Sequence, residues 1–168
     1  VRDFYPDGLQ RTEPPISALW PHMADKLAAL SRQMQPGKVQ AYFVAHLDNL
    51  LGVIAGNPID PSETGGLPVI PIHCDYHPGN LKWAEDQVVG IFDFDWSKMD
   101  LRMFDVGLAV IYFCSLWDDG RDGELRIDKF AIFLRAYQHQ LRQLAGLEPL
   151  TPSEQKLLPN MLSIANIY

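Results

Sequence analysis

Apolar residues recur at every third or fourth position through most of the chain, which is the period of an amphipathic α-helix. Two helices are expected before residue 57, separated by Pro36-Gly37, because this dipeptide stops a helix. Three more are expected after residue 105, the last of them beginning after Thr151-Pro152. The five apolar stripes consist of Leu19, Met23, Leu27, Leu30 and Met34; Phe43, Leu47, Leu50, Leu51 and Ile54; Val106, Val110, Phe113 and Trp117; Ile127, Phe130, Leu134, Tyr137, Leu141 and Leu144; and Leu157, Leu158, Met161 and Ala165.

The middle third of the chain departs from the helical period. The segment Leu67–Cys74 is apolar and contains β-branched residues, and it predicts a strand. Two shorter apolar runs, Leu81–Ala84 and Val88–Asp93, flank a polar turn and predict a small hairpin. The segment 57–68 between the helices and the strand is rich in turn residues and is expected to be an exposed loop. Three tryptophans and one phenylalanine are expected to lie in the core: Trp83, Trp96, Trp117 and Phe113.

Length and composition fit one domain. The 168 residues are 47% hydrophobic, so we predict a single α+β domain over residues 1–168, mostly α-helical. Residues 1–15 contain four Pro or Gly breakers and are expected to form an irregular lead-in. The net charge of -7 disfavours nucleic acid and anionic membranes as partners. No apolar run reaches the roughly 18 residues of a membrane span, and the two cysteines form no C-x-x-C pair, so a cytoplasmic location is expected.

Polar residues interrupt the apolar runs of the middle third in a pattern typical of phosphoryl transfer. His73, Asp75 and Asn80 have the spacing H-x-D-x-x-x-x-N of a kinase catalytic loop. In such a loop the Asp orients an acceptor hydroxyl and takes its proton, and the Asn contributes an oxygen to Mg²⁺. Asp93 follows the second run of the hairpin, where it can complete the metal site between the β- and γ-phosphates. Hard oxygen ligands of this kind favour Mg²⁺ over zinc.

Three segments carry a wider resemblance: HCDYHPGNLKW (His73–Trp83), VVGIFDFD (Val88–Asp95) and FDVGLA (Phe104–Ala109). Together they resemble the aminoglycoside phosphotransferase and homoserine kinase-like family, which consists of small-molecule kinases with a protein-kinase-like fold. A protein kinase proper is disfavoured, because Asp93-Phe94-Asp95 replaces D-F-G and no A-P-E follows. The acceptor is therefore expected to be a small hydroxyl compound such as an aminoglycoside, homoserine or a choline-like molecule.

The resemblance implies a role for each polar residue. Asp75 is expected to be the catalytic base, with His73 supporting the loop from behind. Asn80 and Asp93 are expected to bind Mg²⁺ and, through it, ATP or GTP, with Asp95 as a third candidate metal ligand. Asp105, at the start of the next helix, is expected to tie back to the backbone of the catalytic loop and to be structural.

The resemblance extends only to the C-terminal lobe of the kinase-like fold, with its hairpin carrying the metal-binding Asp. The N-terminal lobe of the family supplies a phosphate-covering loop and a strand lysine. The chain has no G-x-G-x-x-G motif and no Lys in an apolar strand before residue 67. We therefore expect the N-terminal lobe to belong to a longer protein, and the isolated chain to be inactive or nearly so.

Three other interpretations of the same residues are kept open. The chain can be a binding or scaffold module that kept the fold without catalysis. Asp93 and Asp95 also match the D-x-D pattern of a Mg²⁺-dependent aspartyl phosphatase, although that class needs a long α/β domain after the motif. His73, Asp75 and His77 alternate as the ligands of a transition metal can, but Pro78-Gly79 breaks the strand at once. Asp95 fits equally a metal contact, a substrate contact or a turn former.

Overall fold

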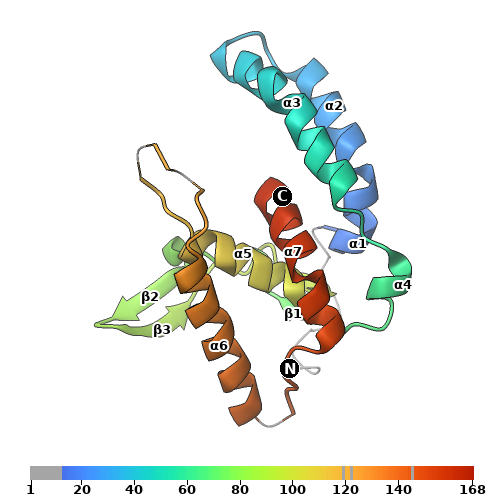
Figure 1. Cartoon of the computed structure of the whole chain (residues 1–168). Coiled ribbons are helices and arrows are strands. Elements are labelled where there is room, and N and C mark those ends of the chain that lie inside the picture. Colours follow the sequence, from blue (N-terminus) through green and yellow to red (C-terminus); the bar gives the residue numbers. More distant parts are fainter. Residues whose placement is uncertain (1–12, 119, 122, 145) are drawn as a thin grey trace.

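The computed structural model describes residues 13–118, 120–121, 123–144 and 146–168. It confirms a mostly helical α+β fold (Figure 1). The helices are α1 (Ile16–Leu19), the 3-10 turn η2 (Trp20–His22), α2 (Met23–Gln33), α3 (Lys38–Gly56), α4 (Pro61–Thr64), the 3-10 turn η3 (Pro78–Asn80), α5 (Arg102–Cys114), α6 (Ile127–Gln143) and α7 (Pro152–Ile167). The strands are β1 (Val69–Ile72), β2 (Leu81–Ala84), β3 (Gln87–Ile91) and β4 (Lys98–Leu101).

The first two predicted helices form an antiparallel hairpin, α2 and α3, which projects away from the other elements in Figure 1. The predicted break at Pro36-Gly37 is confirmed. The single helix predicted before Pro36 is wrong, because a 3-10 turn at Trp20–His22 separates α1 from α2. Pro21 lies at the start of this turn, and its missing N–H removes one helical hydrogen bond. Of the predicted irregular lead-in, residues 1–12 lie outside the described residues.

The β-hairpin is confirmed, and a further strand joins β1. Strands β2 and β3 pair antiparallel, with Leu81 opposite Ile91, so β3 ends two residues before Asp93. Strand β4 pairs antiparallel with β1 and was not expected from the sequence. A buried strand is recognised in a sequence by its apolar residues. Strand β4 instead buries two charged residues, Lys98 and Asp100, so its sequence does not look like that of a core strand.

The loop predicted between residues 57 and 68 contains a short helix, α4, which the sequence analysis missed. Asp60 caps it by accepting a hydrogen bond from the backbone N–H of Ser62, and Pro61 occupies the first helical position. Helix α5 is also shorter than predicted, because the apolar stripe had been expected to reach Trp117. It ends at Cys114, so Trp117 lies beyond it in the connection to α6.

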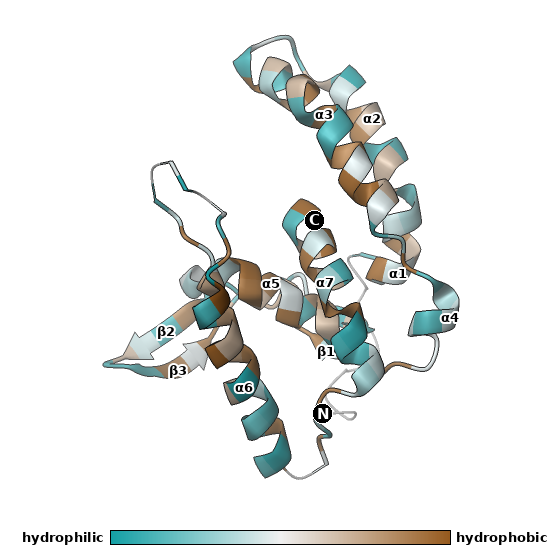
Figure 2. Ribbon diagram, in the orientation of Figure 1, coloured by the Kyte–Doolittle hydropathy of each residue, from teal (hydrophilic) through white to brown (hydrophobic). Residues whose placement is uncertain are grey.

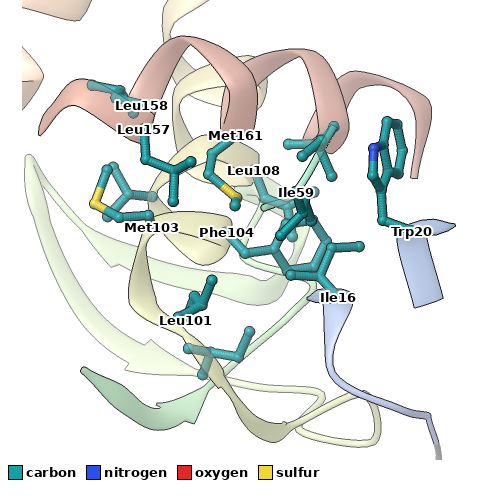
Figure 3. Packing of buried hydrophobic residues seen from close by; sticks show 14 of the residues in the cluster. Ile16, Trp20, Ile59, Leu101, Met103, Phe104, Leu108, Leu157, Leu158 and Met161 are labelled. Carbon is teal, nitrogen blue, oxygen red and sulfur yellow. The ribbon is translucent and has the colours of Figure 1, made fainter. Parts of the chain in front are cut away.

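The core lies where α5 packs against α7. Figure 2 shows α5 as mainly hydrophobic, and Figure 3 shows Leu157 and Met161 of α7 facing Phe104 and Leu108 of α5. Helix α7 begins with a capping box between Thr151 and Glu154, as expected for its predicted start. In the part of the chain that the structure describes, none of the helices combines the length and apolar character needed to cross a membrane.

Candidate active site

The loop that carries the predicted site, residues 73–80, connects β1 to β2 and is tied to α5 at its first residues. The carboxylate of Asp105 accepts the backbone N–H of His73 at 3.1 Å and that of Cys74 at 2.8 Å. Burial raises the pKa of Asp105, and these two backbone hydrogen bonds act in the opposite direction. The loop therefore begins at a fixed position relative to the N-terminal turn of α5.

The buried His73 ring links this loop to the end of the β-hairpin. Its Nδ1 accepts the backbone N–H of Asp75 at 3.3 Å, so the ring proton of the neutral form lies on Nε2. Nε2 then donates to the backbone carbonyl of Phe92 at 2.8 Å. Both ring nitrogens are used in this way, and His73 braces the loop rather than facing a ligand.

The side chains of Asp75 and Asn80 are in contact. Nδ2 of Asn80 donates to the backbone carbonyl of Asp75 and to Asp75 Oδ2, both at 2.9 Å. Because both oxygens of Asp75 are acceptors, the amide group of Asn80 must face them with its nitrogen, and its oxygen Oδ1 points away from Asp75. No described residue donates a hydrogen bond to that oxygen. Asn80 is buried, and its Oδ1 keeps spare acceptor capacity.

His77 also lies close to the carboxylate of Asp75. Its Nδ1 accepts the backbone N–H of Gly79 at 3.0 Å, which places the ring proton of the neutral form on Nε2. Nε2 lies 3.6 Å from Asp75 Oδ2. The His77 ring also packs against Tyr112, with 5.3 Å between ring centroids. Asn80 and His77 thus both approach Oδ2 of Asp75, and Oδ1 has neither as a partner.

The structure brings the end of the hairpin to Asn80. The backbone N–H of Phe92 donates to the backbone carbonyl of Asn80 at 2.9 Å, so Asp93 is one residue from a direct contact with Asn80. Asp93 is exposed and has a left-handed backbone with φ of 60°. Asp95 lies in a tight turn, which is closed by a hydrogen bond from Ser97 N–H to the Phe94 carbonyl.

Backbone strain concentrates at this site. Among the described residues, three residues other than Gly have a positive φ: Cys74, Glu85 and Asp93. Glu85 belongs to the turn of the β-hairpin, where such a conformation is ordinary. Cys74 lies next to the predicted site residue Asp75, and Asp93 is itself a predicted site residue. Strained backbone of this kind is found preferentially at functional sites. The sequence carried no signal of this strain.

A hollow of about 460 Å³ lies beside Asp75. Trp96, Tyr112 and Tyr168 contribute aromatic surface to its lining, and Glu13 and Lys26 contribute charges of opposite sign. These residues were not predicted to share a site, because they come from five separate segments. The prediction that Trp83, Trp96 and Trp117 lie in the core is wrong, since all three are about half exposed.

A buried lysine holds Glu13 in place at the edge of this hollow. Lys98 is 1% exposed, and its ammonium group lies 3.2 Å from Glu13 and 3.4 Å from Asp100. The hydroxyl of Tyr168 donates to the same Glu13 carboxylate and accepts a weak hydrogen bond from the Cys74 thiol. Burial raises the pKa of both the Cys74 thiol and the Tyr168 hydroxyl. Residues from both ends of the described chain therefore meet beside the loop.

The alternative transition-metal cluster has no geometric support. Within the described ranges, no group of three or more His, Cys, Asp and Glu side chains is arranged to hold a metal ion. Both nitrogens of His73 are also engaged by the backbone.

Comparisons with known proteins identify the family. A model of the phosphotransferase enzyme family (APH) matches residues 6–149, and the chain belongs to this family. A homoserine kinase from Rhizobium etli is 28% identical over 144 residues, which are 84% of this chain and 40% of the relative. One from Rhizobium johnstonii is 32% identical over 94 residues, 56% of this chain and 26% of the relative.

A solved structure of choline kinase from Cryptosporidium parvum aligns with 99% of this chain and 50% of its own, at 15% identity and a TM-score of 0.48. The chain spans two fifths or less of the length of the two homoserine kinases. By descent it is a member of a phosphotransferase family, and it corresponds to part of the length of these relatives.

Proposed function

We propose that this chain is the catalytic and acceptor-binding part of a small-molecule kinase that transfers the γ-phosphoryl group of ATP or GTP to a hydroxyl. The observation that carries the proposal is the setting of Asp75. Its Oδ2 is engaged by Asn80, and the residue borders a hollow large enough for a small acceptor. In this proposal Asp75 Oδ1 takes the proton of the acceptor hydroxyl as it attacks.

The other site residues hold this geometry. His73 and Asp105 fix the loop from two directions, through the hairpin and through α5. The spare Oδ1 of Asn80 and the exposed carboxylate of Asp93 would hold Mg²⁺, with Asp95 as a third candidate ligand. Oxygen donors suit this ion, which when bound neutralises charge on the β- and γ-phosphates. Positioning of this kind accounts for most of the rate in phosphoryl transfer.

The lining of the hollow supports an acceptor with charged groups besides its hydroxyl. Lys26 can face a carboxylate of the acceptor. Glu13 is already paired with Lys98 and Tyr168 through Oε2, so it offers Oε1 to a hydrogen-bond donor of the acceptor. The homoserine kinases among the relatives favour the same kind of compound. The N-terminal lobe would supply the remaining nucleotide contacts, and we expect the isolated chain to be inactive or nearly so.

Metal binding tests the site without requiring the other lobe. We expect Mn²⁺, used as a paramagnetic substitute for Mg²⁺, to broaden the backbone amide signals of Asn80 and Asp93 in the isolated chain. Asp93→Asn should remove most of this broadening, because it removes the charged ligand. Asp86→Asn, the same change in the exposed hairpin turn, is the matched control. Equal broadening in Asp93→Asn and the unmodified chain would contradict the assignment of Asp93.

Turnover tests the base. A chimaera in which this chain replaces the matching segment of the Rhizobium etli homoserine kinase supplies the missing length. Asp75→Ala should lower its ATP-dependent phosphorylation of homoserine about 10²- to 10⁴-fold and leave nucleotide affinity nearly unchanged. Asp86→Ala is the control. Near-normal turnover of the Asp75 variant would refute the role of Asp75.

The two rival functions predict different results. An aspartyl phosphatase would release phosphate from an aryl phosphate with Mg²⁺ and no nucleotide, and it would need both Asp93 and Asp95. A scaffold module would give a folded chimaera with no phosphotransfer at all. We expect no aryl phosphate hydrolysis and measurable ATP-dependent transfer.

A further inference from the structure

A second hollow, of about 490 Å³, lies between β1, α5 and α6. It shares no lining residue with the hollow beside Asp75. Residues 74 and 75 of the loop line the first hollow, and the next residue, Tyr76, lines the second. The catalytic loop thus separates two cavities of similar size, and the proposed phosphotransferase function uses one of them.

The walls of the second hollow are mainly apolar and include aromatic surface. Ile70, Val106 and Ala109 contribute aliphatic side chains from β1 and α5. Phe133 and Tyr137 come from adjacent turns of α6, and their rings are nearly parallel, with an interplanar angle of 3° and 6.5 Å between centroids. A pocket of this volume and lining suits a compact ring compound.

The polar groups in this hollow are uncharged, ion-paired or already hydrogen-bonded. The hydroxyls of Tyr76 and Tyr137 and the amide of Gln140 make no hydrogen bond to any residue that the structure describes. Burial raises the pKa of both tyrosines, so they remain neutral hydroxyls at physiological pH.

The charges next to these hydroxyls are paired or engaged. Arg102 is ion-paired with Glu154, and Asp105 accepts two backbone N–H groups. Four of the five guanidinium N–H donors of Arg102 are used, and one on Nη1 has no partner among the described residues. The spare polar capacity therefore consists of hydroxyl, amide and one N–H donor, which pair with the hydroxyl or carbonyl of a neutral ligand.

We propose that this second hollow is a binding site for a neutral aromatic compound of one or two fused rings that carries at least one hydroxyl group. The ring packs on Phe133 and the aliphatic wall, and its hydroxyl pairs with Tyr137. A ligand held here touches Tyr76, which adjoins Asp75, and Asp105, which fixes the loop. If the proposed phosphotransferase function holds, occupancy of the site alters turnover by stiffening the loop.

The test is a titration of the full chain with 2-naphthol, followed through its backbone amide signals in nuclear magnetic resonance. We expect saturable shifts at Tyr76, Ala136 and Tyr137, and none at Lys26 and Trp96 in the first hollow. Tyr137→Phe should weaken binding about five- to tenfold, because it removes one hydrogen bond. No nucleotide or acceptor is present, so the result is independent of the role of Asp75.

A variant whose side chain fills the hollow provides a second test. Ala136 is exposed at the rim of the hollow that it lines, so Ala136→Trp should occupy the hollow and abolish the shifts. Ala45→Trp on the exposed face of α3 is the matched control and should bind as the unmodified chain does. Shifts that do not saturate, shifts centred on Trp96 and Tyr112, or unchanged binding in Tyr137→Phe would overturn the proposal. The tyrosine variant decides the matter even if Ala136→Trp does not fold.

Discussion

At the scale of single residues, the site depends on backbone positions that L-residues adopt at a cost. Cys74 has a φ of 66°, next to the proposed base, while its N–H is held by Asp105 and its thiol is buried. A left-handed backbone costs roughly 1–2 kcal/mol for such a residue, and the surrounding contacts must supply that energy. The hydrogen bonds from the loop backbone to Asp105 of α5 thus hold the loop in a conformation that the loop alone would not keep.

This strain predicts a large effect of a β-branched residue. Cys74→Val should destabilise the fold by about 2–3 kcal/mol, since Val tolerates a positive φ poorly and has less room to adjust. Urea unfolding measures the loss. The matched control is Cys114→Val, which changes the other buried cysteine, in the regular helix α5, and should cost less than about 1 kcal/mol. Equal losses of stability in the two variants would mean that the left-handed backbone of Cys74 is not the cause of the destabilisation.

At the scale of elements, the contact of α5 with α7 supports the site, because α5 carries Asp105. The two helices approach closely at Gly107. A Cβ added there would lie 3.0 Å from the carbonyl oxygen of Met161 and 3.2 Å from the Cβ of Ala165. Both atoms belong to the rigid part of α7, so the helices would have to separate.

The same substitution in two helices should therefore have opposite effects. Gly107→Ala should destabilise by about 1–2 kcal/mol, because overpacking outweighs the gain in helix propensity. Gly52→Ala in α3, where a Cβ would meet nothing within 4 Å, should stabilise by roughly 0.5–1 kcal/mol. Thermal unfolding of both variants gives the comparison. Stabilisation by Gly107→Ala would show that α5 and α7 can move apart without loss.

At the scale of the whole molecule, buried ion pairs connect segments that are distant in sequence. Arg102, at the start of α5, contacts Glu154 in α7 at 2.6 Å, and both side chains are almost fully buried. Burial acts to raise the pKa of Glu154, but Arg102 and the Thr151 backbone outweigh it, so the pKa is lowered. Glu154 therefore contributes stability at pH values above its ordinary pKa, and the contribution is lost as the pH falls through the lowered value.

Removal of the arginine should give a pH-dependent defect. Arg102→Met leaves Glu154 buried without a counter-charge and should cost about 3–5 kcal/mol at pH 7. The defect should shrink below the ordinary pKa of glutamate, because the carboxyl can then be protonated. Urea unfolding at pH 7 and pH 4 measures this. Arg126→Met breaks an exposed pair with Asp128 and should cost less than about 1 kcal/mol at either pH. A defect of the same size at both pH values would contradict the explanation.

Local patterns predicted much of the fold but failed where polar residues are buried or apolar residues are exposed. The apolar period predicted α3, α6 and α7 because it depends only on the residues of one element. Strand β4 was missed because Lys98 and Asp100 are buried as a pair, which no local pattern reveals. The first helix was predicted too long because Pro21 was not counted as a break. Trp96 was expected in the core, since a large apolar side chain says nothing about the hollow it borders.

The sequence by itself determined the family, the helical elements and the spacing of His73, Asp75 and Asn80, because these depend on residues that are near each other in the chain. Only the tertiary structure decided that β4 pairs with β1, that Arg102 pairs with Glu154, and that Glu13 and Tyr168 meet beside Asp75. Such contacts join segments tens of residues apart. They arise from the packing of elements and the satisfaction of buried polar groups, which spacing along the chain does not record.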